Sequence, residues 1–94
     1  MDQASGIEAK RIRVNGRVQG VFFRAAAKRE AESLGLTGWA RNDDDGAVTI
    51  EVEGAPESIG EFLDWCKVGS SRATIERFEV SDISYTGLDG FHIS

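Results

Sequence analysis

The sequence is poor in the residues that most often carry redox and metal chemistry. Cys66 is its only cysteine and His92 its only histidine. One cysteine cannot form an internal disulfide, and one histidine without ligand partners at a recognisable spacing does not make a metal site. We therefore expect no metal and no cofactor. We interpret Cys66, which falls on the apolar stripe of a segment with helical spacing, as a buried structural thiol.

Long hydrophobic runs and an excess of positive charge are also missing. No run approaches the roughly 18 apolar residues that a membrane helix needs, and residues 1–6 contain no apolar signal-peptide core. The net charge is −5, whereas a nucleic-acid-binding protein needs a basic face. We therefore expect a cytoplasmic protein without membrane or nucleic-acid partners. Any anionic ligand needs a local positive site to overcome the overall negative field.

The length of 94 residues predicts a single domain. Residues 1–6 are expected to form a flexible N-terminal tail, and residues 7–94 the domain itself. The sequence contains no internal repeat and no low-complexity segment. No apolar surface stripe is left over once the elements below are assigned, so we expect a monomer.

Five segments show the features of β-strands. In residues 8–15, isoleucine and valine alternate with arginine. The acidic turn Asp43–Gly46 joins the second and third segments as a hairpin. In the fourth segment the alternation slips by one residue between Ile75 and Phe78, which predicts an edge strand with a β-bulge. The expected strands are residues 8–15, 36–42, 47–53, 72–86 and 91–93.

Two segments, residues 22–34 and 56–67, have the apolar spacing of amphipathic helices. Gly35 ends the first, and Pro56 suits the first turn of the second. Apart from the short terminal strand at residues 91–93, the order is therefore strand, helix, strand, strand, helix, strand. It predicts an α+β fold, a ferredoxin-like βαββαβ sandwich in which two helices cover one face of an antiparallel sheet.

Residues 16–24, GRVQGVFFR, lie between the first strand and the first helix. Gly16 and Gly20 permit backbone angles that turn consecutive N–H groups inward as an anion nest, and the helix directs its positive end to the same point. Arg24 can bind two phosphate oxygens with its planar guanidinium. A glycine-rich connector with a surface arginine fits the pattern equally well. The candidate phosphate-binding residues are Gly16, Arg17, Val18, Gln19, Gly20, Val21 and Arg24.

Asn42 ends the second predicted strand. In the βαββαβ layout the third strand lies between the first and second, so an amide at this position can face the loop that enters the first helix. An amide donates and accepts hydrogen bonds and can hold a water molecule, although it cannot act as a base at neutral pH. Spacing alone favours the simpler interpretation, in which Asn42 starts the acidic turn.

The two stretches together resemble a known family. Residues 16–24 and residues 38–42 (GWARN), the latter followed by an acidic turn, are similar to the two signature motifs of acylphosphatases. The resemblance covers about residues 10–93, and the βαββαβ order agrees with it. Two features depart from the family pattern. Residues 69–71 read Gly-Ser-Ser where many members have Gly-Pro, and no basic or aromatic residue follows Ile93.

The resemblance implies an enzyme that hydrolyses the carboxyl-phosphate bond of acyl phosphates to a carboxylate and inorganic phosphate. It implies that Arg24 binds the phosphoryl group, that Asn42 orients the attacking water, and that the main chain of residues 16–21 forms a phosphate cradle. The partners it implies are a small-molecule acyl phosphate as substrate and inorganic phosphate as product or competitive ligand. In some members the terminal segment lies near this arginine, so the departure after Ile93 bears on how Arg24 is held.

The implied chemistry suits the available residues. The leaving carboxylate, whose conjugate acid has a pKa of about 4, departs without a general acid. The transferred phosphoryl group is largely metaphosphate-like, so the protein mainly positions it and neutralises its charge. The alternative is a non-catalytic phosphate- or acyl-phosphate-binding regulatory module of the same fold. Asn42 separates the two hypotheses, because a pure binder needs no positioned water.

Overall fold

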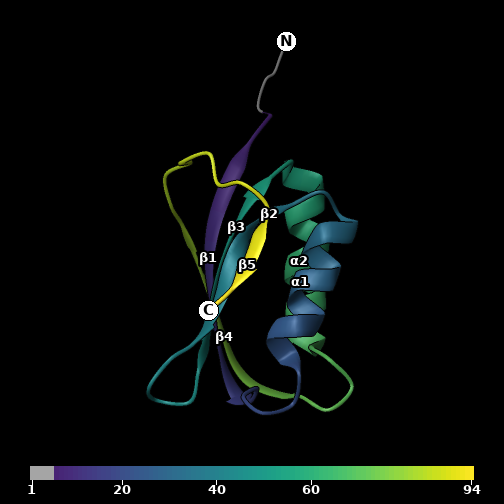
Figure 1. Cartoon of the computed structure of the whole chain (residues 1–94), viewed down its shortest axis with the longest axis vertical. Helices are drawn as coiled ribbons and strands as arrows, with labels where there is room; N and C mark the ends of the chain where they lie inside the picture. The colour runs from purple at the N-terminus through teal and green to yellow at the C-terminus, as the bar shows by residue number, and fades with distance from the viewer. Residues whose placement is uncertain (1–5) are drawn as a thin grey trace.

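The computed structural model describes residues 6–94, in which two helices pack on one face of a five-stranded sheet (Figure 1). Neither helix is long and apolar enough to cross a membrane. The tail predicted for residues 1–6 lies outside the described residues except for Gly6. The elements are β1 (Glu8–Arg17), α1 (Phe23–Ser33), β2 (Thr37–Asn42), β3 (Val48–Gly54), α2 (Pro56–Val68), β4 (Thr74–Asp82) and β5 (Phe91–Ile93).

The strand order is β4-β1-β3-β2-β5. The first four strands of this order pair antiparallel, which confirms the ferredoxin-like arrangement. The last strand makes the sheet mixed, because β5 runs parallel to β2, with Gly38 opposite Phe91 and Ala40 opposite Ile93. Residues 83–90 carry the chain from the β4 edge across the end of the sheet to the β5 edge, so β5 starts beside the start of β2 (Figure 1).

Apolar side chains from three adjacent strands supply the sheet side of the core. Ile12 lies opposite Ile50, and Ile50 lies opposite Ala40. These side chains share the helix-covered face and are fully buried, in one cluster with Phe23 of α1 and Phe62 of α2. Complete burial of a large apolar side chain contributes about 1.5–3 kcal/mol. This packing fixes α1 over the sheet and therefore fixes its first turn, where the site is built.

The pairing of β1 with β4 contains the predicted bulge. Asn15 lies opposite Arg77, whereas Gly16 lies opposite Ile75. Glu76 is therefore the extra residue of β4, and Phe78 returns to the same face as Ile75 beyond it. Both apolar side chains pack partly buried against the core. The slip in alternation that the sequence shows between them is thus the bulge itself.

Gly16 is required by the close approach of β4. Its φ is 134°, and a Cβ at this position would overlap the main-chain carbonyl oxygen of Thr74. Gly16 and Arg17, which were expected to open the loop, are the last two residues of β1. The strand predicted for residues 8–15 therefore extends by two residues, and the connection to α1 is only five residues long.

Glu53 is a charged residue inside the fold, with 2% of its surface exposed. Its carboxylate accepts hydrogen bonds from the main-chain N–H groups of Thr86 (2.7 Å), Gly87 (3.0 Å) and Leu88 (2.7 Å), and from the Thr86 hydroxyl (3.1 Å). Burial by itself raises the pKa of Glu53, but these hydrogen bonds outweigh it and leave the pKa below its ordinary value. Glu53 thereby holds the segment that leads from β4 to β5.

Candidate active site

The connection between β1 and α1 runs through residues 18–22. Val18 anchors it, because its side chain is buried. Gly20 and Phe22 have φ values of 73° and 60°, and these left-handed positions curl the chain just before α1. No side chain caps the first turn of α1. The free N–H groups of a helix start are therefore available to an anion at this point.

Phe22 is unusual in both conformation and exposure. Among residues 6–94 it is the only non-glycine residue with positive φ, a conformation that costs an L-residue about 1–2 kcal/mol. The residue is 76% exposed, although aromatic residues usually bury most of their surface. The turn is thus strained and leaves its aromatic side chain on the surface, which is typical of residues kept for function.

Arg24 lies in the first turn of α1, and its Nη1 donates a hydrogen bond to the main-chain oxygen of Ser94. The main-chain N–H of Ser94 in turn donates to the oxygen of Ala40, at 2.9 Å. The end of the chain thus positions the guanidinium without a basic or aromatic side chain after Ile93. Arg24 lines a cavity of about 370 Å³ with Val18, Gly20, Phe22, Phe23, Ala25 and Ile93.

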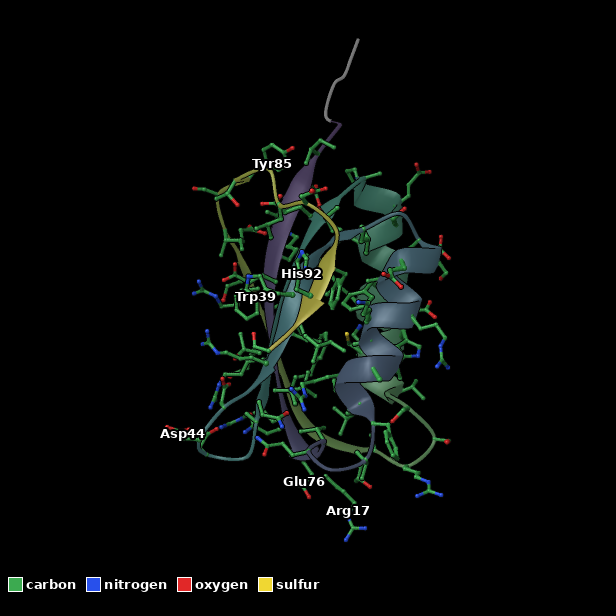
Figure 2. All side chains as sticks on the ribbon, viewed as in Figure 1. Arg17, Trp39, Asp44, Glu76, Tyr85 and His92 are labelled. Carbon is green, nitrogen blue, oxygen red and sulfur yellow. The ribbon has the colours of Figure 1, made fainter. Side chains whose placement is uncertain are left out.

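Asn42 is brought to the same end of the molecule by strand register. It lies opposite Val48, which lies opposite Val14, and side chains directly opposite each other share a face. Asn42 therefore belongs to the helix-covered face, and its side chain is exposed. Its position across the sheet corresponds to Val14 of β1, two residues before Gly16. The strand register is compatible with an amide that faces the loop before α1. Figure 2 shows that Arg17, at the end of β1, and Asp44, in the β2–β3 turn, lie at the same end of the molecule.

Gln19 connects the loop to the turn that follows Asn42. Its Nε2 donates to the main-chain oxygens of Asp43 (2.8 Å) and Ala47 (2.9 Å). These carbonyls begin and end the β2–β3 turn, so one side chain sets the position of Asn42 relative to the loop. Sequence reasoning missed this role of Gln19. The only signal was a long amide between two glycines, and its partners are revealed only by the tertiary structure.

We expect Gln19→Met to lower the free energy of unfolding by about 1–2 kcal/mol, because two carbonyls lose their donor while the apolar volume is kept. Chemical denaturation measures the loss, and hydrogen exchange should show faster opening at Asp43 and Gly46, whose N–H groups bond within the turn. Gln19→Glu has the same shape but repels both carbonyl oxygens, so it should lose more. Equal stability of all three proteins would contradict the role.

Two of the three aspartates in the acidic turn form ion pairs with neighbouring arginines. Arg13 forms ion pairs with Asp43 (3.6 Å) and Asp45, and Arg41 pairs with Asp43 at 3.1 Å. Burial raises the pKa of Asp43, but hydrogen bonds from Thr49 and Arg41 outweigh this and lower it overall. Within residues 6–94, no group of three or more His, Cys, Asp or Glu side chains is placed to hold a metal ion. Two arginines thus offset two of the turn's three negative charges beside Asn42.

The remaining chemically interesting side chains lie apart from this arrangement. Cys66 is fully buried in the core, as expected, and burial raises the pKa of its thiol, so it stays protonated and unreactive. His92 lies beside Trp39 across the β2–β5 pair, on the sheet face opposite the helices (Figure 2). Its Nε2 is 2.7 Å from the main-chain oxygen of Asp89.

The chain is similar to known proteins over almost its whole length. The family model described as Acylphosphatase matches residues 10–93. A protein named acylphosphatase from Azoarcus sp. (strain BH72) is 43% identical over 90 residues, covering 96% of this chain and 92% of that protein. The solved acylphosphatase of Coxiella burnetii superimposes with a TM-score of 0.91 at 30% identity, covering 95% of this chain and 94% of the other. That of Bacillus subtilis has a TM-score of 0.89 at 37% identity, with coverages of 94% and 98%.

Proposed function

Since the chain belongs to the acylphosphatase family and is therefore an enzyme that hydrolyses acyl phosphates, we propose that residues 16–21 and Arg24 bind the phosphoryl group and that Asn42 orients the attacking water. The observation that carries this proposal is the position of Arg24. Its guanidinium lies at the start of α1, which no side chain caps, and donates a hydrogen bond to the main-chain oxygen of Ser94. A guanidinium has five N–H donors, so one bond to Ser94 leaves others for phosphate oxygens.

Phosphoryl binding requires positive charge in a protein of net charge −5. The main-chain N–H groups between Val18 and Phe22 and the start of α1 supply partial positive charge, and Arg24 supplies a full one. A planar guanidinium matches two phosphate oxygens at once. These groups stabilise the charge that spreads over the equatorial oxygens of a metaphosphate-like transition state. The step therefore needs no covalent intermediate.

The hydrolytic step forms a bond between water oxygen and phosphorus and breaks the bond between phosphorus and the carboxyl oxygen. The carboxylate leaves with the bonding electron pair and needs no proton, since its conjugate acid has a pKa of about 4. The side-chain oxygen of Asn42 accepts a hydrogen bond from the water and holds it in line. The proton that the water loses passes to an oxygen of the phosphoryl group itself. Gln19 is a positioning residue, because it holds the turn beside Asn42.

Inorganic phosphate, the product, binds the same cradle and competes with the substrate. Six large apolar side chains are exposed within residues 6–94, and those that line a common cavity do so in pairs, Phe22 with Ile93 and Ile7 with Tyr85, which does not suggest an extensive oligomer interface. We infer a monomer formed by residues 7–94 that acts on small acyl phosphates in the cytoplasm. The exposed apolar side chains are Ile7, Phe22, Val68, Val80, Tyr85 and Ile93.

The test is hydrolysis of benzoyl phosphate by the purified chain in the presence of a metal chelator. The release of inorganic phosphate measures the rate. We expect turnover that is insensitive to the chelator and competitively inhibited by added phosphate. A non-catalytic module would bind phosphate, as measured by calorimetry, and would not raise the rate of hydrolysis above that of the buffer. That result would overturn the proposal.

A further inference from the structure

The cations of this protein fall into two groups. Several on the sheet and one at the end of α2 are matched by carboxylates. Lys10 pairs with Asp82, and Lys67 lies 4.0 Å from Asp64. Arg11, Arg13 and Arg41 pair with acidic residues of β3 and the β2–β3 turn. These pairs neutralise one another, so they contribute little field at the loop that begins α1.

Arg29 and Arg72 belong to the other group. Neither forms an ion pair with any residue from 6 to 94, and both are exposed. They come from different elements, α1 and the connection between α2 and β4, yet they line one cavity of about 320 Å³. Two like charges that converge without an acidic partner repel each other, so this arrangement is stabilised by an anion between them.

A second observation points to a ligand in the same cavity. Ser70 lines it, together with Ser71. The hydroxyl oxygen of Ser70 is shielded from solvent and has no hydrogen-bond partner in the described part of the chain. An unpaired buried hydroxyl costs about 1–3 kcal/mol, and rotation of the Ser70 side chain toward the cavity would let an anionic ligand accept its hydrogen bond. The cavity therefore offers two guanidinium groups, and a hydroxyl donor once the Ser70 side chain turns toward it.

This cavity adjoins the cavity that contains Arg24. Phe22 and Ala25 line both of them, so the exposed ring of Phe22 stands between the two. Arg29 follows Arg24 by five residues on the same helix, which corresponds to about 7–8 Å along its axis and about 140° around it, so a ligand that contacts both follows the helix surface past Phe22. A substrate whose phosphoryl group lies at Arg24 can therefore reach the second cavity with a short chain that passes over the Phe22 ring.

We propose that Arg29, Arg72 and Ser70 form a subsite for a second anionic group carried by the acyl part of the substrate. The subsite rests on the proposed function, since it binds the far end of the same acyl phosphate. Its ligand chemistry is a carboxylate or a phosphate separated from the acyl phosphate by a few methylene groups. The apolar stem of such a substrate contacts Phe22 and Ala25, and its two charged ends contact Arg24 on one side and the Arg29–Arg72 pair on the other.

The experiment compares two acyl phosphates that differ only at the far end. Adipoyl phosphate carries a distal carboxylate, and hexanoyl phosphate ends in a methyl group. We expect Arg29→Ala and Arg72→Ala each to lower kcat/KM for adipoyl phosphate about five- to tenfold, the loss of one charge-assisted hydrogen bond. For hexanoyl phosphate the change should stay within about twofold, because this substrate places no charge in the subsite.

Arg77→Ala is the matched control, because Arg77 is also an exposed arginine and does not line the cavity. It should lower kcat/KM for both substrates by the same small factor, since it changes only the overall field. Arg72→Lys keeps the charge and should keep most of the preference for adipoyl phosphate. Circular dichroism verifies that each variant is folded.

The outcomes separate the subsite from the activity. Turnover of both substrates with an adipoyl-to-hexanoyl ratio that Arg29→Ala and Arg72→Ala leave unchanged would overturn the subsite and leave the proposed function standing. Turnover of neither substrate by the unmodified protein would overturn both. Free adipate is also tested as an inhibitor. If it inhibits hexanoyl phosphate hydrolysis through Arg72 while the substrate ratio is unaffected, the site binds a separate anion, and the assignment to the substrate is wrong.

Discussion

Arg24→Ala is expected to lower kcat/KM for benzoyl phosphate by about three orders of magnitude, the lower end of what an arginine contributes in phosphoryl transfer. The loss combines weaker phosphoryl binding with lost neutralisation of the transition state, so both KM and kcat should change. Steady-state kinetics and calorimetric titration with inorganic phosphate separate the two contributions. Arg24→Lys keeps the charge but not the planar fork, and its activity should fall between those of the two other proteins.

Lys28→Ala is the control for this variant, because it removes one positive charge from the same helix, four residues further on. Its kcat/KM should stay within about twofold of the unmodified protein, since Lys28 is partly exposed, lines neither cavity near Phe22 and acts on the loop only through a screened field. Arg24→Ala should remain folded, because Arg24 is only partly buried. Activity of Arg24→Ala within tenfold of the unmodified protein would show that the phosphoryl group binds elsewhere.

Asn42→Ala should produce the second large effect, a fall in kcat of about two orders of magnitude, as when a single positioned hydrogen-bonding group is removed from an active site. The affinity for inorganic phosphate should change little, because Asn42 acts on the water and not on the cradle. A large fall in kcat at constant phosphate affinity is the pattern of a group that acts only in the transition state. It also separates an enzyme from a phosphate-binding module, for which Asn42 would have no function.

Asn42→Asp tests which atom of the amide is used. The carboxylate keeps the acceptor that would hold the water but adds a negative charge near the phosphoryl oxygens. We expect it to recover part of the lost turnover and to weaken phosphate binding, most clearly at low salt where repulsion is less screened. If Asn42→Ala turns over benzoyl phosphate at the normal rate, the water is held by another group and the proposed role is wrong.

The local features of the fold could be predicted from the sequence because each depends on residues close to it. The two helices follow from apolar spacing, and the bulge follows from the slip between Ile75 and Phe78. The direction of β5 could not be predicted in the same way. A three-residue strand carries too little pattern to choose its partner, and its direction depends on residues 83–90, which Glu53 holds from another strand.

The site was less accessible to sequence reasoning alone. Residue spacing left the role of Arg24 undecided and favoured a turn role for Asn42. The resemblance to acylphosphatases suggested that both belong to the active site. Two contributions were missed because they exist only between elements distant in sequence. Gln19 bonds to a turn more than twenty residues away, and Arg29 and Arg72 converge on one cavity from separate elements. The spacing of residues within one segment does not indicate contacts between segments that are distant in the sequence.

Protonation of Glu53 controls how firmly the segment before β5 is held. Because its pKa is lowered by the fold, its contribution to stability is present above the ordinary pKa of glutamate and is lost as the pH falls through the lowered value. Protonation weakens its hold on residues 86–88, the segment that leads into β5 and on to Ser94, whose main-chain oxygen positions the guanidinium of Arg24. We therefore expect acid to affect the proposed phosphate site from the far end of the sheet, through the chain that runs from residues 86–88 to Ser94.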